Sequence, residues 1–177
     1  MTAKKMIPFL MLFILLGLLA WELFYAKPGE LPSALIGEDI PTFNLPNVFP
    51  DKPNFQSYDL KNGVVLLNVW ATWCYACSLE HEMLMKIKNQ YHVRIFSINY
   101  KDKAEDATEW LNQHGNPYVI TGEDSNGDVG IDLGVYGTPE TFVIHQGKIV
   151  YRHVGTIDQR AWDEVLFPMI EKYESVR

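Results

Sequence analysis

Residues 64–77 read VVLLNVWATWCYAC, the most informative run in the chain. Its first half, Val64–Trp70, is almost entirely apolar, which is typical of a strand buried on both faces of a sheet. Beyond this run, apolar side chains recur at the spacing of a helix, at Met83, Leu84, Ile87 and Tyr91. We therefore predict a helix from about Tyr75 to Gln90. The two cysteines, Cys74 and Cys77, stand where the buried strand passes into this helix.

Strands and helices alternate in the remaining sequence. Further strands are predicted at residues 40–45, as an edge strand, and at 93–99, 118–121, 141–145 and 148–152. Further helices are predicted at residues 103–114, in a short piece after a turn at 124–127, and at 158–173. Gln146-Gly147 joins the last two strands into a hairpin, and Asp158 caps the last helix. This order predicts an α/β fold with a mixed central sheet and helices on both faces.

The first 26 residues are predicted to form a separate membrane anchor. Lys4 and Lys5 precede an apolar run, Met6–Ala26, that only Glu22 interrupts. A helix of this length spans roughly 30 Å, about the thickness of a bilayer core. A cleaved signal peptide and a buried core helix are the alternatives. The run lacks the small-x-small cleavage site of a signal peptide, and it lacks the charged face of a core helix.

The two lysines ahead of the anchor predict a cytoplasmic N-terminus, with the rest of the chain outside. In a cell with two membranes this is the periplasm, so we predict a single-pass protein of the inner membrane. Residues 27–36 contain two prolines and a glycine and are predicted to form a tether. Residues 37–177 then form one domain.

Composition excludes several functions. The chain has 15 Lys and Arg, 22 Asp and Glu, and a net charge of −7, which argues against a nucleic-acid partner. Two cysteines supply neither a disulfide-rich scaffold nor a four-cysteine zinc site. A c-type haem site needs His directly after the second Cys, where Ser78 stands. A zinc site using His81 would lack an evident fourth ligand, so we predict no metal and no cofactor.

The placement of the cysteines predicts thiol chemistry. A helix N-terminus carries free N–H groups and a partial positive charge, which lower the pKa of a thiol placed there. Cys74 is therefore expected to attack disulfides as a thiolate. Cys77, one turn further in, is expected to be less exposed and to act as the resolving thiol. A bridge between them closes a very short loop, so a purely structural disulfide is the weaker interpretation.

Two further features are open to more than one interpretation. Glu80 lies three residues after Cys77, so it either exchanges a proton with that thiol or simply complements the helix dipole in solvent. His81 is expected to be a partner or surface residue rather than a catalyst. Thr138-Pro139 precedes the hairpin, where a cis proline would leave the backbone of Thr138 free to pair with a substrate, although base rates favour trans.

Six strings of the sequence are specific: SALIG (33–37), LLNVWATWC (66–74), NYKD (99–102), GNPY (115–118), GVYGTPETFVI (134–144) and YRHVG (151–155). On these strings the chain resembles the thioredoxin-like family and, within it, the membrane-anchored DsbE/CcmG proteins of cytochrome c biogenesis. The pattern WCxxC alone would indicate only the wider family. The string GVYGTPETF is the one that points to the narrower group.

The resemblance implies a thioredoxin fold with Pro139 cis, Cys74 as the nucleophile and Cys77 as the resolving thiol. It also implies that Glu80 acts near the active site. Thioredoxin itself uses a buried Asp on the preceding strand, where this chain has Asn68. The residues implied to bind the substrate are Trp73, Tyr136, Thr138, Pro139 and Glu140. Tyr75-Ala76 departs from relatives that often have Pro first, and this interior tunes the reduction potential.

The function implied is reduction of the disulfide in the C-x-x-C-H haem-binding motif of apocytochrome c. A membrane electron donor of the DsbD or CcdA kind would then reduce the Cys74–Cys77 pair again, and other cytochrome c maturation proteins are possible partners. A general or other-pathway thiol–disulfide oxidoreductase on the same fold is the main alternative. A copper chaperone of the Sco type is a weaker one, because such proteins usually space their cysteines by three residues and add a distant His ligand.

Overall fold

The structure is a computed structural model that describes residues 7–25 and 35–174. The chain divides into two compact units, Met1–Leu31 and Pro32–Arg177, and each is described by itself. The first contains helix α1, Ile7–Tyr25. Within the described residues, no helix is both long and apolar enough to cross a membrane. The predicted anchor therefore stays a prediction. Parts of this prediction lie outside the described residues: Lys4 and Lys5, the two ends of the apolar run (Met6 and Ala26), and residues 27–34 of the predicted tether.

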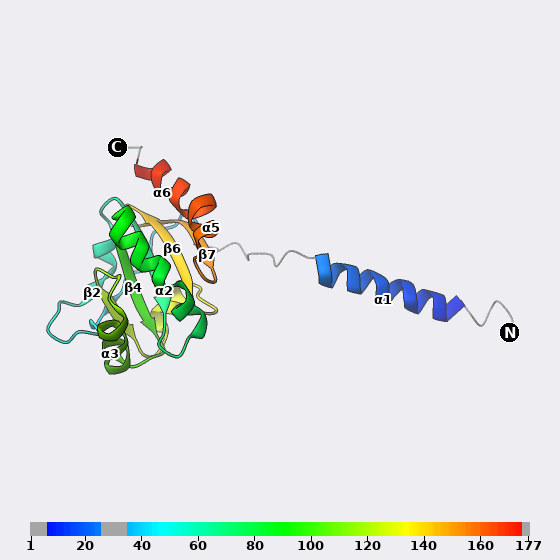
Figure 1. Cartoon of the computed structure of the whole chain (residues 1–177), viewed down its shortest axis with the longest axis horizontal. Helices are drawn as coiled ribbons and strands as arrows, with labels where there is room; N and C mark the ends of the chain where they lie inside the picture. Colours follow the sequence, from blue (N-terminus) through cyan, green and yellow to red (C-terminus); the bar gives the residue numbers. More distant parts are fainter. Residues whose placement is uncertain (1–6, 26–34, 175–177) are drawn as a thin grey trace. The chain divides into compact units, whose positions relative to one another are not determined.

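The second unit is built on a five-stranded sheet with the strand order β5-β4-β3-β6-β7. Figure 1 shows its strands β4, β6 and β7. The strands are β3 (Val64–Trp70), β4 (Ile95–Tyr100), β5 (Thr121–Asp124), β6 (Glu140–His145) and β7 (Lys148–Val154). Strands β3, β4 and β5 are parallel, whereas β6 is antiparallel to both β3 and β7. The predicted mixed sheet and the hairpin are thus confirmed. All seven residues of β3 are buried, as its apolar run predicts.

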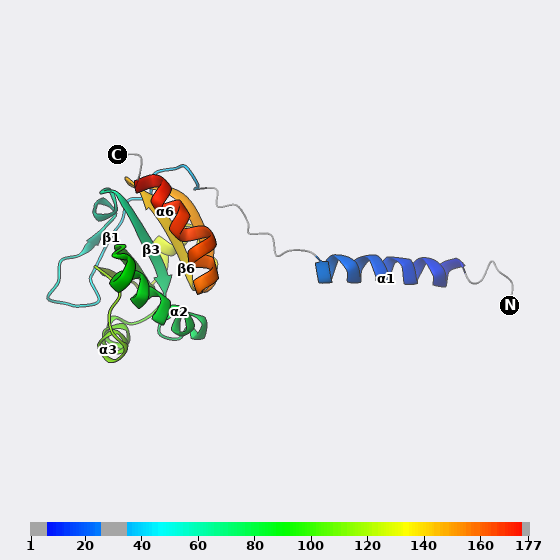
Figure 2. The ribbon, with the colours of Figure 1, turned by 45° about the horizontal axis from the view of Figure 1, so that its top comes forward.

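Helices cover one face of the sheet. They are α2 (Tyr75–Lys86), extended by a π-helical turn (Ile87–Tyr91), α3 (Ala104–His114), and a last helix made of α5 (Gln159–Ala161), a π-helical turn (Trp162–Leu166) and α6 (Phe167–Glu174). Figure 2 shows α2 and α6 over this face. Its core joins Leu66 and Trp70 of the sheet to Leu84, Leu111 and Trp162 of the helices. Asp158 caps the last helix as predicted, because its side chain accepts the Ala161 N–H at 2.7 Å.

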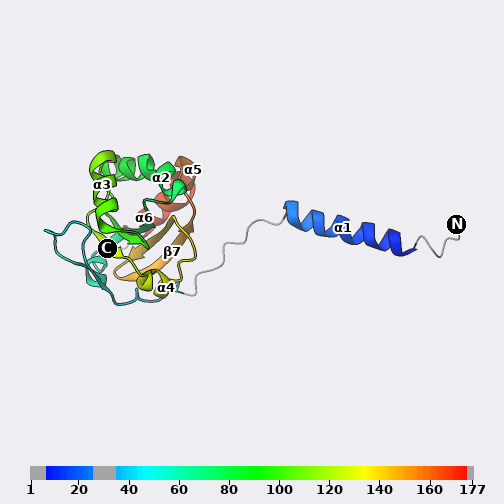
Figure 3. The same ribbon diagram turned by 90° about the horizontal axis from the view of Figure 1, so that it is seen from below.

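The opposite face is covered by α4 (Asp128–Asp132) and by residues 35–60. Figure 3 shows α4 on the other side of the sheet from α2 and α3, so helices lie on both faces as predicted. Residues 35–60 contain a separate two-stranded sheet, β1 (Asn44–Leu45) with β2 (Phe55–Gln56), and a 3₁₀ helix, Ser57–Leu60. Phe55, Leu60 and Leu133 pack there against Val65 and Leu67 of β3.

The predicted edge strand at residues 40–45 is wrong for most of its length. Residues 37–48 instead run from one edge of the sheet to the other, and we call this segment the strap. At one end, Ile40 N–H bonds the Gly147 carbonyl beside β7. At the other end, Val48 N–H bonds the Thr121 carbonyl of β5. Pro41 and Pro46 lack the N–H groups of a regular strand, which explains why only two residues of the segment form one.

The strand predicted at residues 118–121 lies three residues further along, as β5. Its sequence, Thr-Gly-Glu-Asp, has no apolar residue, so an apolar pattern could not locate it. The pairing with β4 is supported instead by polar contacts, since the Ser97 hydroxyl donates to the Thr121 hydroxyl at 2.8 Å. The predicted turn after it is present, because Gly127 N–H bonds the Asp124 carbonyl.

Candidate active site

The cysteines form a disulfide at the N-terminus of α2. Cys74 is the N-cap residue, and its Sγ accepts the backbone N–H of Cys77 at 3.1 Å. The predicted strand-to-helix placement is therefore confirmed. The helix N-terminus presents an N–H group to the sulfur of Cys74, which stabilises a thiolate at that position once the disulfide is reduced.

Exposure barely separates the two cysteines. Cys74 is 6% exposed and Cys77 is 5% exposed in the oxidised pair, so Cys77 is the less exposed of the two, as expected, but by only one percentage point. The difference between them lies in the backbone. The sulfur of Cys74 caps the helix, whereas Cys77 lies inside its first turn. The sequence neighbours of Cys74, Trp73 and Tyr75, are 59% and 77% exposed and add aromatic surface to this part of the domain.

Asp102 holds the loop that leads to Cys74. Its carboxylate accepts both the backbone N–H and the hydroxyl of Thr72, at 2.6 and 3.0 Å. It also accepts the Asn99 amide and the Lys103 N–H, both at 2.9 Å. Partial burial raises the pKa of Asp102, but these hydrogen bonds outweigh burial, and the net pKa is lowered. Sequence reasoning missed this residue as part of the site, although it ends the quoted string NYKD.

Glu80 is buried behind the cysteines, with 1% of its surface exposed. Its Oε1 accepts the Asn68 amide and its Oε2 accepts the Ile157 N–H, both at 2.9 Å. Burial raises the pKa of Glu80 from 4.5 to about 7, against the lowering effect of these two hydrogen bonds. The alternative of a solvent-exposed carboxylate beside the helix dipole is wrong. Glu80 is placed to bind or release a proton near neutral pH, one helical turn from Cys77.

Asn68 links Glu80 to two other buried groups. Its amide N–H₂ also donates to the Thr141 hydroxyl at 3.0 Å, and its carbonyl accepts the Tyr118 hydroxyl at 2.9 Å. The sequence pointed to Asn68 as the residue in place of an aspartate. Sequence reasoning did not assign Tyr118 to the site, although it ends the quoted string GNPY; it lies 50 residues from Asn68 in the chain.

The loop before β6 lies at the same edge of the sheet as the cysteines. Val69 of β3 pairs with Glu140 of β6, so the residues just before Glu140 face the segment that leaves β3 toward Cys74. The Thr138-Pro139 peptide bond is cis, as the resemblance implies. Pro139 is buried, and the buried hydroxyl of Thr138 has no hydrogen-bond partner among the described residues.

Glu140 is fully buried, so the expectation that it contacts substrate does not fit this structure. Its carboxylate instead pairs with Arg152, at 2.5 Å from Nη2 and 2.8 Å from Nε. The other oxygen accepts the N–H groups of Tyr136 and Gly137, at 3.1 and 3.3 Å. The Arg152 guanidinium lies 4.8 Å from the centre of the Tyr136 ring. Glu140 and Arg152 thus hold the loop in shape, while the Tyr136 side chain on that loop is 60% exposed.

His81 is buried and packs inside the domain, so it is not the surface residue that was one of its two expected roles. Its Nε2 lies 3.1 Å from the His114 carbonyl, and its ring packs edge-on against Trp110 at 4.5 Å. Burial lowers the pKa of His81. Over the part of the chain that the structure describes, no group of three or more His, Cys, Asp or Glu side chains is arranged to hold a metal ion.

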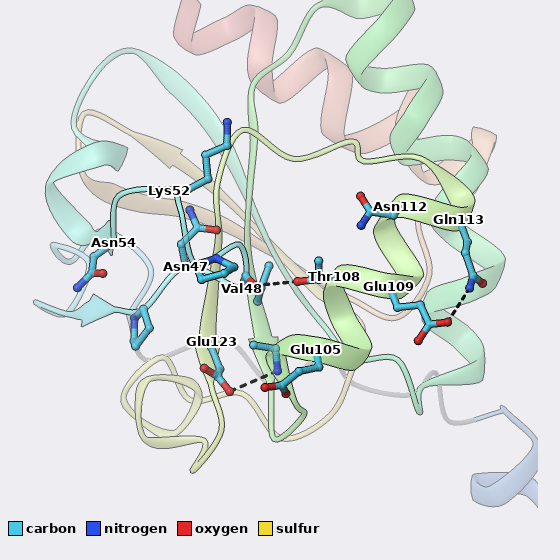
Figure 4. Close-up of a pocket in the computed structure, with 13 residues that line it drawn as sticks. Asn47, Val48, Lys52, Asn54, Glu105, Thr108, Glu109, Asn112, Gln113 and Glu123 are labelled. Carbon is cyan, nitrogen blue, oxygen red and sulfur yellow. Dashed lines mark hydrogen bonds between the residues drawn. The ribbon is translucent and has the colours of Figure 1, made fainter.

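The described grooves lie away from the disulfide. One groove of about 670 Å³ runs between the strap and α3 (Figure 4). Hydrogen bonds from the Thr108 hydroxyl to the Val48 carbonyl and from Ala104 N–H to Glu123 span its floor. Neither cysteine lines it. The disulfide is largely buried, and its sequence neighbours Trp73 and Tyr75 are exposed, so the surface beside it suits a polypeptide substrate better than a small molecule.

Comparison with known proteins agrees with this geometry. The family model described as Redoxin matches residues 35–166. The thiol:disulfide interchange protein DsbE of Vibrio cholerae is 43% identical over 171 residues, which cover 94% of this chain and 92% of that protein. The protein of the same name from Escherichia coli K12 is 41% identical over 174 residues, with 95% and 94% covered.

Two solved structures show the same fold at lower identity. A secreted thiol-disulfide isomerase from Corynebacterium glutamicum has a TM-score of 0.64 at 20% identity, covering 75% of this chain and 85% of that one. A thiol:disulfide interchange protein of the thioredoxin family from Chlorobium tepidum has a TM-score of 0.60 at 22% identity, covering 75% and 95%.

Proposed function

The chain belongs to the Redoxin family and is a thiol–disulfide oxidoreductase, and we propose that it reduces the disulfide of the C-x-x-C-H motif of apocytochrome c in the periplasm. The observation that carries the proposal is the Cys74–Cys77 pair at a helix N-terminus, with the buried Glu80 carboxyl one turn away. The choice of apocytochrome c rests on the resemblance to DsbE/CcmG proteins, above all through the string GVYGTPETF.

The reaction begins with the reduced pair. The Cys74 thiolate attacks one sulfur of the substrate disulfide, and the other substrate sulfur leaves as a thiolate that takes up a proton. Cys77 then attacks Cys74 in the mixed disulfide and releases the second substrate sulfur. The substrate gains two electrons and becomes a dithiol, whereas the Cys74–Cys77 pair loses them and becomes the disulfide seen in the structure.

Glu80 has the role of proton acceptor in the second step. Cys77 must lose its proton before it can attack, and Glu80 follows it by three residues on the same helix. A carboxyl with a pKa of about 7 exchanges protons readily at neutral pH. Trp73 and Tyr136 offer exposed aromatic surface to the polypeptide, and the backbone of Thr138 beside Pro139 is proposed to pair with its extended chain.

The proposed location is the inner membrane, with the catalytic domain in the periplasm and the N-terminus in the cytoplasm. This part rests on the sequence alone, through Lys4, Lys5 and the apolar run Met6–Ala26. Helix α1 accounts for residues 7–25 of that run. The pair is proposed to be reduced again by a membrane donor of the DsbD or CcdA kind.

A trapping experiment tests the substrate. Cys77→Ala in the full chain removes the resolving thiol, so that substrates stay disulfide-linked to Cys74 in cells making c-type cytochromes. The double variant Cys74→Ala/Cys77→Ala is the matched control and should trap nothing. Recovery of apocytochromes c supports the proposal. Recovery of many unrelated exported proteins would instead assign the same chemistry to a general oxidoreductase.

A further inference from the structure

Three side chains from separate parts of the chain form a buried hydrogen-bonded series. The Tyr118 hydroxyl, before β5, donates to Oδ1 of Asn68 in β3 at 2.9 Å. The Nδ2 of Asn68 donates to Oε1 of Glu80 in α2 at 2.9 Å. The residues are 6%, 0% and 1% exposed, respectively. Tyr118 thereby lies two hydrogen bonds from Glu80, although it is remote from it in sequence.

The hydroxyl of Tyr118 fixes which way the Asn68 amide faces. An amide side chain has one oxygen that accepts and one nitrogen that donates. Burial raises the pKa of Tyr118 well above its usual range, so its hydroxyl stays protonated and remains a donor. With the Asn68 oxygen turned toward this donor, its nitrogen faces Glu80 and Thr141. This orientation favours the carboxylate form of Glu80 over the protonated form.

The reverse orientation would have the opposite effect. If the amide turned over, its oxygen would face Glu80 and accept the proton of the neutral acid, which would hold that proton in place. We propose that Tyr118 is a positioning residue for proton transfer at Glu80 and that it acts by orienting the Asn68 amide. This inference rests on the proposed role of Glu80 as the acceptor of the Cys77 proton.

Of the two described groups hydrogen-bonded to Glu80, only the Asn68 amide can present either a donor or an acceptor. The Ile157 N–H, from the loop before α5, is a backbone donor and cannot reverse. On α2 itself, His81 bonds the His114 carbonyl rather than Glu80, and Cys77 is the thiol that Glu80 is proposed to serve. Among the described residues, no charged side chain is hydrogen-bonded to Glu80.

The test is Tyr118→Phe in the full chain, which removes the hydroxyl and keeps the ring that stacks on Trp70. Two quantities are measured: the pKa of the Glu80 carboxyl, by carbon NMR of the oxidised protein, and the pH profile of the resolution step in single-turnover reduction of a C-x-x-C-H peptide disulfide. Both are expected to shift upward, by about half to one pH unit for the loss of one neutral hydrogen bond. Tyr91→Phe is the matched control, because that ring packs against Trp162 and Phe167 instead.

Two further variants show whether the effect passes through Asn68. Asn68→Leu should also raise the pKa of Glu80, and adding Tyr118→Phe to it should give no further shift. Replacing Tyr118 with 3-fluorotyrosine strengthens the donor almost without change of shape. The pKa of Glu80 should then fall, which tests the inference even if Tyr118→Phe does not fold.

The outcomes separate this inference from the proposed function. If Glu80→Gln slows resolution while Tyr118→Phe and fluorotyrosine leave both pH measurements unchanged, the positioning role is overturned and the role of Glu80 stands. If Glu80→Gln leaves resolution unchanged, both are overturned. An equal shift in Tyr91→Phe would also overturn the positioning role, because it would reveal a general effect of losing a tyrosine hydroxyl.

Discussion

The side-chain amide of Asn68 donates a hydrogen bond of 2.9 Å to the buried carboxyl of Glu80, twelve residues further along the chain. The bond joins the central strand β3 to the helix that carries both cysteines. It also fixes the position of a group whose pKa burial raises to about 7. The hydrogen bond thus ties the carboxyl of Glu80 on α2 to the central strand of the sheet.

The first prediction concerns the stability of the oxidised protein between pH 4.5 and 7. Because the folded pKa of Glu80 is raised, its contribution is greatest at low pH and is lost as the pH rises through the folded pKa. From the unfolded value of 4.5 to about 7, this loss is about 3 kcal/mol in the free energy of unfolding. Urea unfolding at a series of pH values is expected to show this loss in the native chain and not in Glu80→Gln.

The difference between the two proteins is the decisive quantity in that experiment. His81, whose pKa burial lowers, stabilises the fold above its unfolded value of 6.5 and less as the pH falls, which is the opposite slope. This contribution is present in both proteins and cancels. Parallel stability curves for the native chain and Glu80→Gln would contradict the raised pKa.

The second prediction concerns Asp102, which holds the loop before Cys74 through Thr72. Asp102→Asn loses one carboxylate acceptor, so the loop should loosen and kcat/KM for disulfide reduction should fall about tenfold, since the lost charge-assisted bonds are worth roughly 1.5–3 kcal/mol in all. Faster hydrogen exchange of the Thr72 amide is expected with it. The exposed Asp51 supplies the control, and equal losses in Asp51→Asn would argue against a specific role.

The lowered pKa of Asp102 also predicts how the stability of the domain falls in acid. Its lowered pKa means that its stabilising contribution is complete above its unfolded value of 3.8 and is lost as the pH falls through the lower folded value. Removing the carboxylate should therefore flatten part of the stability loss below about pH 4. Acid unfolding followed by circular dichroism would measure this, and identical acid profiles for the native chain and Asp102→Asn would refute it.

The third prediction concerns the buried ion pair between Glu140 and Arg152. Arg152→Met leaves the Glu140 carboxylate buried without its cation, which should lower the free energy of unfolding by about 3–5 kcal/mol. The double variant with Glu140→Gln should recover part of this loss. The exposed pair of Lys148 and Asp39 is the control, where Lys148→Met should cost less than about 1 kcal/mol.

The fourth prediction concerns Gly122, at the point where the strap crosses β5. A Cβ atom on Gly122 would lie 2.9 Å from the Cβ of Leu45 and 3.0 Å from the ring of Phe55. Gly122→Ala should therefore destabilise the domain by about 1–3 kcal/mol, measured by urea unfolding. A Cβ on Gly137 would meet nothing within 4 Å, so Gly137→Ala should leave stability nearly unchanged. Equal stability of the two variants would show that the strap yields at this crossing.

The sequence was most informative where burial is complete on both faces. Strand β3 was predicted to the residue because every position in Val64–Trp70 is buried and all but one are apolar. Strand β5 was misplaced because its residues are polar and its pairing depends on side chains of β4. Residues 40–45 were mistaken for a strand because their apolar side chains are buried against the sheet face, although only Asn44–Leu45 forms a strand, and it pairs with β2 rather than with the five-stranded sheet.

The site was predictable in its reactive atoms and much less in its supports. Cys74 and Cys77 are recognised as a redox pair by their spacing and by their position where a buried strand is followed by a helix. The sequence pattern did not decide whether Glu80 is buried or exposed, because its contacts come from Asn68 in β3 and from Ile157 in a loop 77 residues away. Arg152 and Tyr118 act through contacts that only the folded sheet creates.

The strap also determines how this sheet can meet other chains. Gly37 donates to Ile149 on the outer edge of β7, Ile40 donates to Gly147 just before that strand, and Val48 donates to Thr121 on the outer edge of β5. Unpaired sheet edges are where proteins add strands from other molecules and begin to aggregate. One short segment occupies part of both outer strands and so shortens the open ladder that a second copy can meet on either side. Crowded copies of the domain should resist edge-to-edge association until the strap is cleaved or peels away.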